Sequence, residues 1–146
     1  IVLDWGCVVD GYCSDITRSF CLDRADERYT AIWQVVRQAQ EAAIQGARAG
    51  IPGSDVDRLA RDVIAQAGYG DRFGHSLGHG VGLAIHEGPR YSFTYAQEVP
   101  AGAVMTIEPG IYIPGWGGVR LEDMVVVTDG GVELLTASPK VPVVGG

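Results

Sequence analysis

Two runs rich in valine, isoleucine, tyrosine and cysteine flank the dipeptide Asp10-Gly11 near the start of the chain. Asp-Gly between two such runs is the strongest short-range signal for a β-hairpin with a tight turn. We therefore predict a hairpin over residues 1–22, with Asp10 and Gly11 as its turn residues. In that register Val9 lies opposite Tyr12.

The predicted register gathers polar residues on one face of the hairpin. Counting outward from the turn places Gly6 opposite Asp15 and Asp4 opposite Thr17. Because strand side chains alternate between faces, these four residues share one side, and the backbones of Asp4 and Asp15 are about 7–8 Å apart. Two carboxylates can close that separation around a cation. The alternative is an ordinary solvent-exposed face that happens to carry two acids.

Apolar residues recur at helical spacing in two stretches between residues 26 and 68. The first stretch runs from about Asp26 to Arg48. In the second, Ser54 is a candidate N-cap with Asp57 three residues later, and Gly68 suits the position just past the end. The apolar positions are Ile32, Val35, Val36, Ala39 and Ala43, then Leu59, Val63 and Ile64. We expect this helix pair to cover a sheet and to carry no chemistry.

All three histidines, His75, His79 and His86, lie within a dozen residues of a glycine-rich segment. Glycines make a helix unfavourable, and no glutamate follows the first histidine as in a helical HExxH zinc motif. We therefore expect an irregular strand or loop that passes close to a ligand. Neutral imidazole binds divalent first-row metals, although a single histidine would more often be a hydrogen-bonded core residue.

Two glutamates end or interrupt apolar runs farther along the chain. Glu108 follows the run 104–107 and precedes Pro109-Gly110, which must break a strand. The segment 118–127 reads as one strand with Arg120 and Glu122 on the same face. An ionised glutamate in such a strand is costly unless it is paired or binds a metal. A salt bridge between Glu122 and Arg120 is the alternative, but it leaves Glu108 unexplained.

Five candidate metal ligands therefore follow one another along the chain. They supply four carboxylates and one imidazole, a mostly oxygen-donor set that suits Mn²⁺ or Co²⁺ better than a thiolate-rich zinc site, with Zn²⁺ and Fe²⁺ as alternatives. Four carboxylates balance two dications, whereas one dication would leave two negative charges. The sequence thus predicts two metal ions, held by Asp4, Asp15, His79, Glu108 and Glu122.

Composition limits the class of protein. The 146 residues are 47% hydrophobic, without low-complexity sequence, and amount to one domain. A net charge of −7 argues against nucleic acid or an anionic membrane as a partner. No apolar run approaches the roughly 20 residues of a membrane span. Three cysteines, Cys7, Cys13 and Cys21, form no disulfide framework or zinc ribbon, so a cytoplasmic location is the expectation.

Several short motifs, in this order and at this spacing, resemble the pita-bread metallopeptidases, the family of methionine aminopeptidase, aminopeptidase P and prolidase. The resemblance implies an α+β fold, a curved and mostly antiparallel sheet with covering helices. It divides the chain into a hairpin at 1–22, a helix pair at 26–68 and metal-binding strands at 73–135. The motifs are Leu3–Gly6, Asp10–Arg18, Gly78–Gly82, Ile85–Pro89, Thr106–Tyr112 and Val119–Asp123.

The resemblance also implies a role for each metal ligand. Asp4 would bind one metal, His79 and Glu108 the other, and Asp15 and Glu122 would bridge both. The metals would share a water molecule and lower its pKa, so that hydroxide attacks the scissile carbonyl near neutral pH. Glu108 beside that water would carry the proton.

His86 resembles the second histidine of the family, which would contact the substrate and assist at the tetrahedral intermediate. Other residues match the Xaa-Pro-cleaving branch of the family, aminopeptidase P and prolidase, in which Arg120 would orient Glu122. His75, Ile85 and Tyr112 would build the proline pocket, with His75 also supporting catalysis. The alternatives are a methionine aminopeptidase and, in another class, a non-catalytic pita-bread module that binds peptides or proteins.

Relative to a complete pita-bread domain, the chain opens at the last hairpin of the first half. We expect the N-terminal part of the domain to be absent and the chain to represent the C-terminal two-thirds of the catalytic domain, which would fold poorly alone. The full-length protein is expected to be a homodimer with peptides as substrates.

Overall fold

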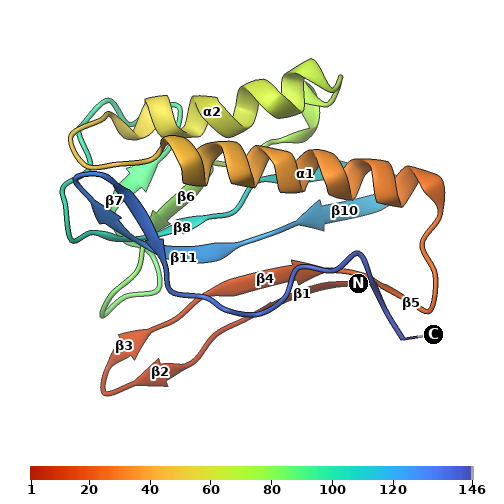
Figure 1. Ribbon diagram of the computed structural model, residues 1–146, viewed down its shortest axis with the longest axis horizontal. Coiled ribbons are helices and arrows are strands. Elements are labelled where there is room, and N and C mark those ends of the chain that lie inside the picture. The colour runs from red at the N-terminus through yellow and green to blue at the C-terminus, as the bar shows by residue number, and fades with distance from the viewer. Residues whose placement is uncertain (146) are drawn as a thin grey trace.

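The computed structural model describes residues 1–145 and has a layered arrangement, with two helices above a sheet and a long hairpin below it (Figure 1). In the hairpin, β1 (Val2–Trp5) pairs with β4 (Ile16–Ser19), and β2 (Val8–Val9) pairs with β3 (Tyr12–Cys13). The hairpin tip with β2 and β3 projects away from the helices (Figure 1).

The register predicted for the hairpin is confirmed. Val9 pairs with Tyr12, and Asp4 pairs with Thr17. Asp10 and Gly11 have φ values of 51° and 87°, the left-handed conformations that a tight type I′ turn requires. A side chain at Gly6 would place its Cβ 1.9 Å from the carbonyl oxygen of Ser14. This glycine therefore permits a close approach of the two backbones.

The first helix matches its prediction closely. Helix α1 spans Glu27–Gly46, and the carboxylate of its N-cap, Asp26, accepts a hydrogen bond of 2.6 Å from the Tyr29 amide. Its apolar face, with Ile32, Trp33 and Val36 fully buried, packs toward the sheet.

The second helix, α2, spans Gly53–Gln66 and begins before the predicted cap. Ser54 was expected at the N-cap, but that prediction is wrong, because Pro52 holds the position and Ser54 lies inside the helix. The amides of Gly53 and Ser54 donate to the carbonyls of Gln97 and Tyr95, at 3.0 and 2.8 Å. A neighbouring loop thus satisfies the first helical donors, and no side-chain cap is required. Gly68 has a φ of 85° just past the end, as predicted.

The central sheet has five antiparallel strands in the order β12-β11-β8-β6-β7. A short ladder of β9 with β10 adjoins it, and β5 pairs in parallel with β13 near the two chain ends. The strands are β5 (Cys21–Leu22), β6 (Gly78–Gly80), β7 (Glu87–Tyr91), β8 (Val104–Ile107), β9 (Gly110–Ile113), β10 (Gly117–Arg120), β11 (Asp123–Thr128), β12 (Gly131–Leu134) and β13 (Val143–Val144), with a 3₁₀ turn η1 (Gly70–Arg72).

The single strand predicted over residues 118–127 is wrong, because it breaks at Leu121 and Glu122 into β10 and β11. The Leu121 amide donates to the carbonyl of Pro109 at 3.4 Å, and the Glu122 amide donates to the carbonyl of Thr17 at 3.1 Å. Hydrogen bonds to two different partners therefore end one ladder and start the next. Glu122 is brought against the hairpin at this break.

The helices in residues 1–145 are α1, α2 and η1. None of them is both long and apolar enough to cross a bilayer.

Candidate metal centre

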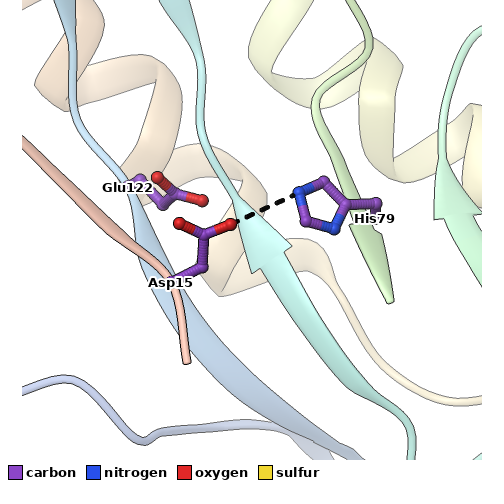
Figure 2. A group of neighbouring side chains, drawn as sticks. All are labelled: Asp15, His79 and Glu122. Carbon is purple, nitrogen blue, oxygen red and sulfur yellow. Dashed lines mark ion pairs between the residues drawn. The ribbon is translucent and has the colours of Figure 1, made fainter. Parts of the chain in front are cut away.

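Asp15, His79 and Glu122 come from three separate parts of the chain and point toward one another (Figure 2). Asp15 directly precedes β4, His79 is the central residue of β6, and Glu122 lies in the break between β10 and β11. One potential ligand atom from each lies within 4.8 Å of the others. The sheet and the hairpin beneath it meet at this cluster.

The imidazole of His79 is oriented by its neighbours. Its Nδ1 lies 3.0 Å from the carbonyl oxygen of Gly80, so this nitrogen carries the proton in the neutral tautomer. The other nitrogen, Nε2, lies 3.3 Å from Oε1 of Glu108 and 3.7 Å from Oδ2 of Asp15. Burial lowers the pKa of His79, but the hydrogen bonds to Glu108 and Gly80 outweigh it and raise the pKa overall. A positive charge is therefore favoured at this point.

Glu108 is held where β8 ends. Its backbone amide donates to the carbonyl of Leu77 at 2.8 Å, and the hydroxyl of Thr106 donates to its Oε1 at 3.1 Å. The same hydroxyl accepts a hydrogen bond of 3.0 Å from the His79 amide. Thr106 thus ties the segments of His79 and Glu108 together.

Glu122 is almost fully buried, with 2% of its surface exposed. Its Oε2 accepts a hydrogen bond of 2.5 Å from the Thr17 hydroxyl. Burial, followed by the nearby carboxylate of Glu108, raises the pKa of Glu122 to about 8. Burial and the charge of Asp4 also raise the pKa of Asp15. Both acids lie in a field of excess negative charge.

Asp4 lies at the edge of the cluster and pairs with the guanidinium of Arg120. Arg120 also donates to the Tyr112 hydroxyl at 3.2 Å and to the Thr17 hydroxyl at 3.0 Å, and its Nε is 4.0 Å from Oε2 of Glu108. The alternative salt bridge between Arg120 and Glu122 is not among the ion pairs of the described residues. The Thr17 hydroxyl bridges these two side chains instead.

The residues predicted to face a substrate lie beside this cluster. The ring of His86, an exposed residue, is centred 4.1 Å from that of His79. His75 stands edge-on to Phe73 and Tyr112, with ring centroids 5.0 and 5.6 Å away. One cavity of about 440 Å³ is lined by His75, Ser76, Gly78, His79, His86, Arg90, Glu108 and Arg120.

A second cavity of about 420 Å³ lies on the hairpin side of the cluster. It is lined by Asp4, Asp15 and Ile85 together with Trp5 and Val8. A larger cavity of about 860 Å³, next to Tyr29 and Trp116, contains none of the candidate residues. The two smaller cavities therefore border the candidate metal ligands.

The donor set fits divalent cations. The carboxylates of Asp15, Glu108 and Glu122 converge with Nε2 of His79, whereas Arg120 is the one arginine or lysine paired with this group in residues 1–145. Oxygen donors with one imidazole suit hard or borderline metal ions. Burial, and after it the repulsion of nearby acids, raises the pKa values of Asp15 and Glu122, and a bound cation would offset both effects.

Helix α2 carries no group that touches the cluster, but it holds the segment that leads to His79. Asp57, fully buried, forms an ion pair with Arg61 at 2.7 Å and accepts a hydrogen bond of 3.0 Å from the Leu77 amide. Arg61 donates at 2.9 Å to the carbonyls of both Phe73 and His75. The pair therefore holds the segment that leads into β6. An acid and an arginine at i and i+4 on a helical face gave the sequence signal for it.

Thr17 and Thr106 are site residues that the sequence reasoning missed. Thr17 was placed on the same face as Asp4 and Asp15, but no role was assigned to its hydroxyl. Thr106 lies two residues before Glu108, a spacing that puts both on one face of a strand. That spacing was the available signal.

Residues 1–129 match Metallopeptidase family M24. The chain is 45% identical over 140 residues to the Xaa-Pro dipeptidase of Pyrococcus furiosus, covering 96% of this chain and 40% of that protein. A solved Xaa-Pro dipeptidase from Bacillus anthracis matches with a TM-score of 0.95 and 46% identity, over 97% of this chain and 40% of the other. The X-Pro aminopeptidase of Thermotoga maritima matches with a TM-score of 0.95 and 43% identity, over 98% and 40%.

These similarities confirm the predicted pita-bread fold of the α+β class. The chain spans about 40% of the length of the relatives it matches, and its expected place as the C-terminal two-thirds of a catalytic domain stays a prediction. The family match covers most of the chain and accords with the converging carboxylates and imidazole. The chain therefore belongs to metallopeptidase family M24.

Proposed function

We propose that the full-length protein removes an N-terminal residue that precedes proline, by hydrolysis that depends on two divalent ions, Mn²⁺ or Co²⁺. The observation that carries this proposal is the convergence of three carboxylates on Nε2 of His79. With Asp4 at its edge, the group holds four carboxyl groups, and two dications would balance their four negative charges when all are ionised. Asp4, Asp15, His79, Glu108 and Glu122 would hold the two ions.

When bound, the two ions would lower the pKa of water and polarise the scissile carbonyl. Residues of the chain would transfer the proton and stabilise the charge that develops in the transition state. Glu108, which accepts a hydrogen bond from the Thr106 hydroxyl, would accept a proton from the attacking water and deliver it to the leaving amine. His86, exposed beside His79, can donate a hydrogen bond to the oxygen that gains charge in the transition state.

The proposed preference for proline rests on the surroundings of the cluster and on the relatives. The rings of His75 and Tyr112 lie edge to face, and His75 lines the cavity of about 440 Å³, so a flat aromatic surface is available to a proline ring. Ile85 lines the second cavity. Two of the similar proteins are named Xaa-Pro dipeptidases and a third an X-Pro aminopeptidase. Arg120 would keep the acids in place through Thr17 and Asp4.

The decisive experiment combines metal analysis of the full-length protein with peptide assays in Mn²⁺. We expect two ions per chain and turnover of Xaa-Pro dipeptides or of longer peptides that begin Xaa-Pro; the preferred length distinguishes a dipeptidase from an aminopeptidase. Asp15→Asn should reduce turnover to below a few per cent, because it removes one of the carboxylate charges that would hold the ions. Asp62→Asn, an exposed acid of α2, is the matched control and should retain activity.

Each alternative has its own signature in this experiment. Turnover of Met-Ala peptides alone would assign the protein to methionine aminopeptidases. Bound peptide without metal and without turnover would instead indicate a non-catalytic module. A protein with two ions that cleaves none of these peptides would contradict the proposed substrate class but not the metal centre.

A further inference from the structure

Gln40 is a polar residue in the middle of the apolar face of α1, and it is completely buried. Its Nε2 donates two hydrogen bonds, one to the carbonyl oxygen of Ile107 at 3.0 Å and one to the carbonyl oxygen of Leu121 at 3.2 Å. These two residues directly precede Glu108 and Glu122. One side chain is thus bonded to the backbone next to both glutamates of the cluster.

The orientation of the Gln40 amide is determined by its partners. Its Oε1 accepts a hydrogen bond of 2.7 Å from the ammonium of Lys140. The reversed orientation would place the amide oxygen against two carbonyl oxygens and the amide nitrogen against an ammonium, which repel. Both amide hydrogens are therefore used, one for each carbonyl.

Lys140 links this amide to the buried ion pair of Asp123 and Arg18. Its ammonium also pairs with the carboxylate of Asp123, which follows Glu122 and forms an ion pair of 2.7 Å with Arg18. Arg18 in turn donates to the backbone carbonyls of Thr17 and Glu122. Arg18 and Gln40 thus bind two successive backbone carbonyls, those of Glu122 and of Leu121.

The location of these bonds gives them a specific consequence. Glu108 and Glu122 lie just past the end of the β8–β11 ladder, whose last pair is Ile107 with Asp123, so no ladder pair joins the backbones of the two glutamates at these points. Gln40 spans both points with one rigid planar group. A shift of either backbone would break one of its two bonds, which in a buried site costs the full desolvation of the group left unpaired.

We propose that Gln40 is a positioning residue that sets the distance between Glu108 and Glu122, and thereby the geometry in which two metal ions are held. The inference rests on the proposed function. Gln40 lies behind the site and does not touch the reacting atoms. Its effect passes through the backbone of Ile107 and Leu121, as expected for residues that support metal ligands.

The test compares full-length wild-type protein with Gln40→Leu, which removes both donors, and Gln40→Glu, which in its protonated form keeps one. Val36→Ala, one turn earlier on the same buried face, is the control for a general loss of packing. Mn²⁺ affinity and stoichiometry are measured by calorimetry. The exchange coupling between the two Mn²⁺ ions is measured by electron paramagnetic resonance, and kcat and KM are measured separately.

We expect Gln40→Leu to weaken Mn²⁺ binding about 10–100-fold and to change the spin coupling, with Gln40→Glu intermediate. Val36→Ala should lower the melting temperature but leave metal affinity and coupling as in the wild type. In Gln40→Leu, kcat should fall more than KM changes. If Gln40→Leu does not fold, the Mn²⁺ affinity and spin coupling of Gln40→Glu test the inference.

Wild-type affinity and coupling in a folded Gln40 variant would overturn the inference, as would an equal loss in Val36→Ala. A wild-type protein that binds no Mn²⁺ would instead refute the proposed function itself. The two failures are therefore distinguishable.

Discussion

At the scale of single residues, Thr17 connects charges of opposite sign that do not touch. Its hydroxyl accepts a hydrogen bond from Nε of Arg120 at 3.0 Å and donates one to Oε2 of Glu122 at 2.5 Å. Thr17 itself is fully buried. The hydroxyl thereby fixes the carboxylate of Glu122 while leaving its second oxygen free for a cation.

Thr17→Val, which keeps the shape and removes the hydroxyl, should destabilise the protein by about 1–3 kcal/mol, because a buried acceptor and a buried donor lose their partner. It should also lower kcat by loosening Glu122. Urea unfolding and steady-state kinetics measure the two effects. Thr17→Ser is the control, since it restores the hydroxyl; a serine variant as impaired as the valine variant would show that the methyl group matters more.

Glu122 also predicts how the metal-free protein responds to pH. Burial, followed by Glu108, raises its pKa from 4.5 to about 8. A carboxyl group with a raised pKa stabilises the fold in its protonated form, so this contribution is complete below pH 4.5 and is lost as the pH rises through about 8. The raised pKa values of Asp15 and His79 act in the same direction.

The metal-free, full-length protein should therefore lose stability between pH 5 and pH 8.5, by an amount on the order of a few kcal/mol. Urea unfolding in the presence of a chelator measures this slope. Glu122→Gln cannot ionise and should flatten it. A stability that stays constant or rises over this range in the wild type would show that Glu122 titrates normally.

At the scale of elements, α2 positions the segment that carries two of the three histidines. Asp57 and Arg61 bind the backbone at Phe73, His75 and Leu77. The guanidinium of Arg61 also lies over the rings of Phe73 and Phe93, at 4.3 and 5.1 Å. The helix thus acts as a clamp on an irregular, glycine-rich stretch whose own backbone has little preference for one conformation.

Arg61→Met should cost about 3 kcal/mol of unfolding free energy, because it leaves Asp57 charged and buried with one fewer partner. Arg58→Met is the matched control on the same helix. Arg58 is 65% exposed in an ion pair of 3.0 Å with Asp55, and its loss should cost less than about 1 kcal/mol. Denaturant unfolding compares them. Equal losses of unfolding free energy in the two variants would refute the role of Arg61 in holding this segment.

At the scale of the whole molecule, the candidate metal centre lies where two layers meet that are already linked by hydrogen bonds, such as the one from Thr17 to Glu122. Asp15 comes from the hairpin below the sheet, whereas His79 belongs to the sheet itself (Figures 1 and 2). In the absence of a cation, converging carboxylates oppose the contact between the layers. A ligand that binds only the folded state shifts the unfolding equilibrium toward that state.

Mn²⁺ at about 100 times its dissociation constant should therefore stabilise the full-length protein by about 2.7 kcal/mol for each independent site. Thermal unfolding with and without a chelator measures the gain. Asp15→Asn should lose most of it, whereas Asp62→Asn should keep it. A melting temperature that does not respond to Mn²⁺ in the wild type would argue against any metal centre.

Sequence by itself determined the features that depend on near neighbours in the chain. Asp10-Gly11 specifies the turn, and the turn specifies the register that pairs Asp4 with Thr17. Asp26 caps α1 through an amide three residues away. These features depend on local dihedral angles and short hydrogen bonds, which a linear sequence encodes directly.

Only the tertiary structure decided the features in which distant segments compete for the same backbone groups. Ser54 was not needed as a cap, because the loop at Tyr95 and Gln97 supplied the acceptors. The strand through Glu122 broke, because its amide bonds to Thr17 in the hairpin, more than 100 residues earlier. The role of Gln40 depends on the packing of α1 against Ile107 and Leu121, whose carbonyls accept its hydrogen bonds. Hydrogen bonds between remote segments depend on packing, and packing is settled by the whole fold.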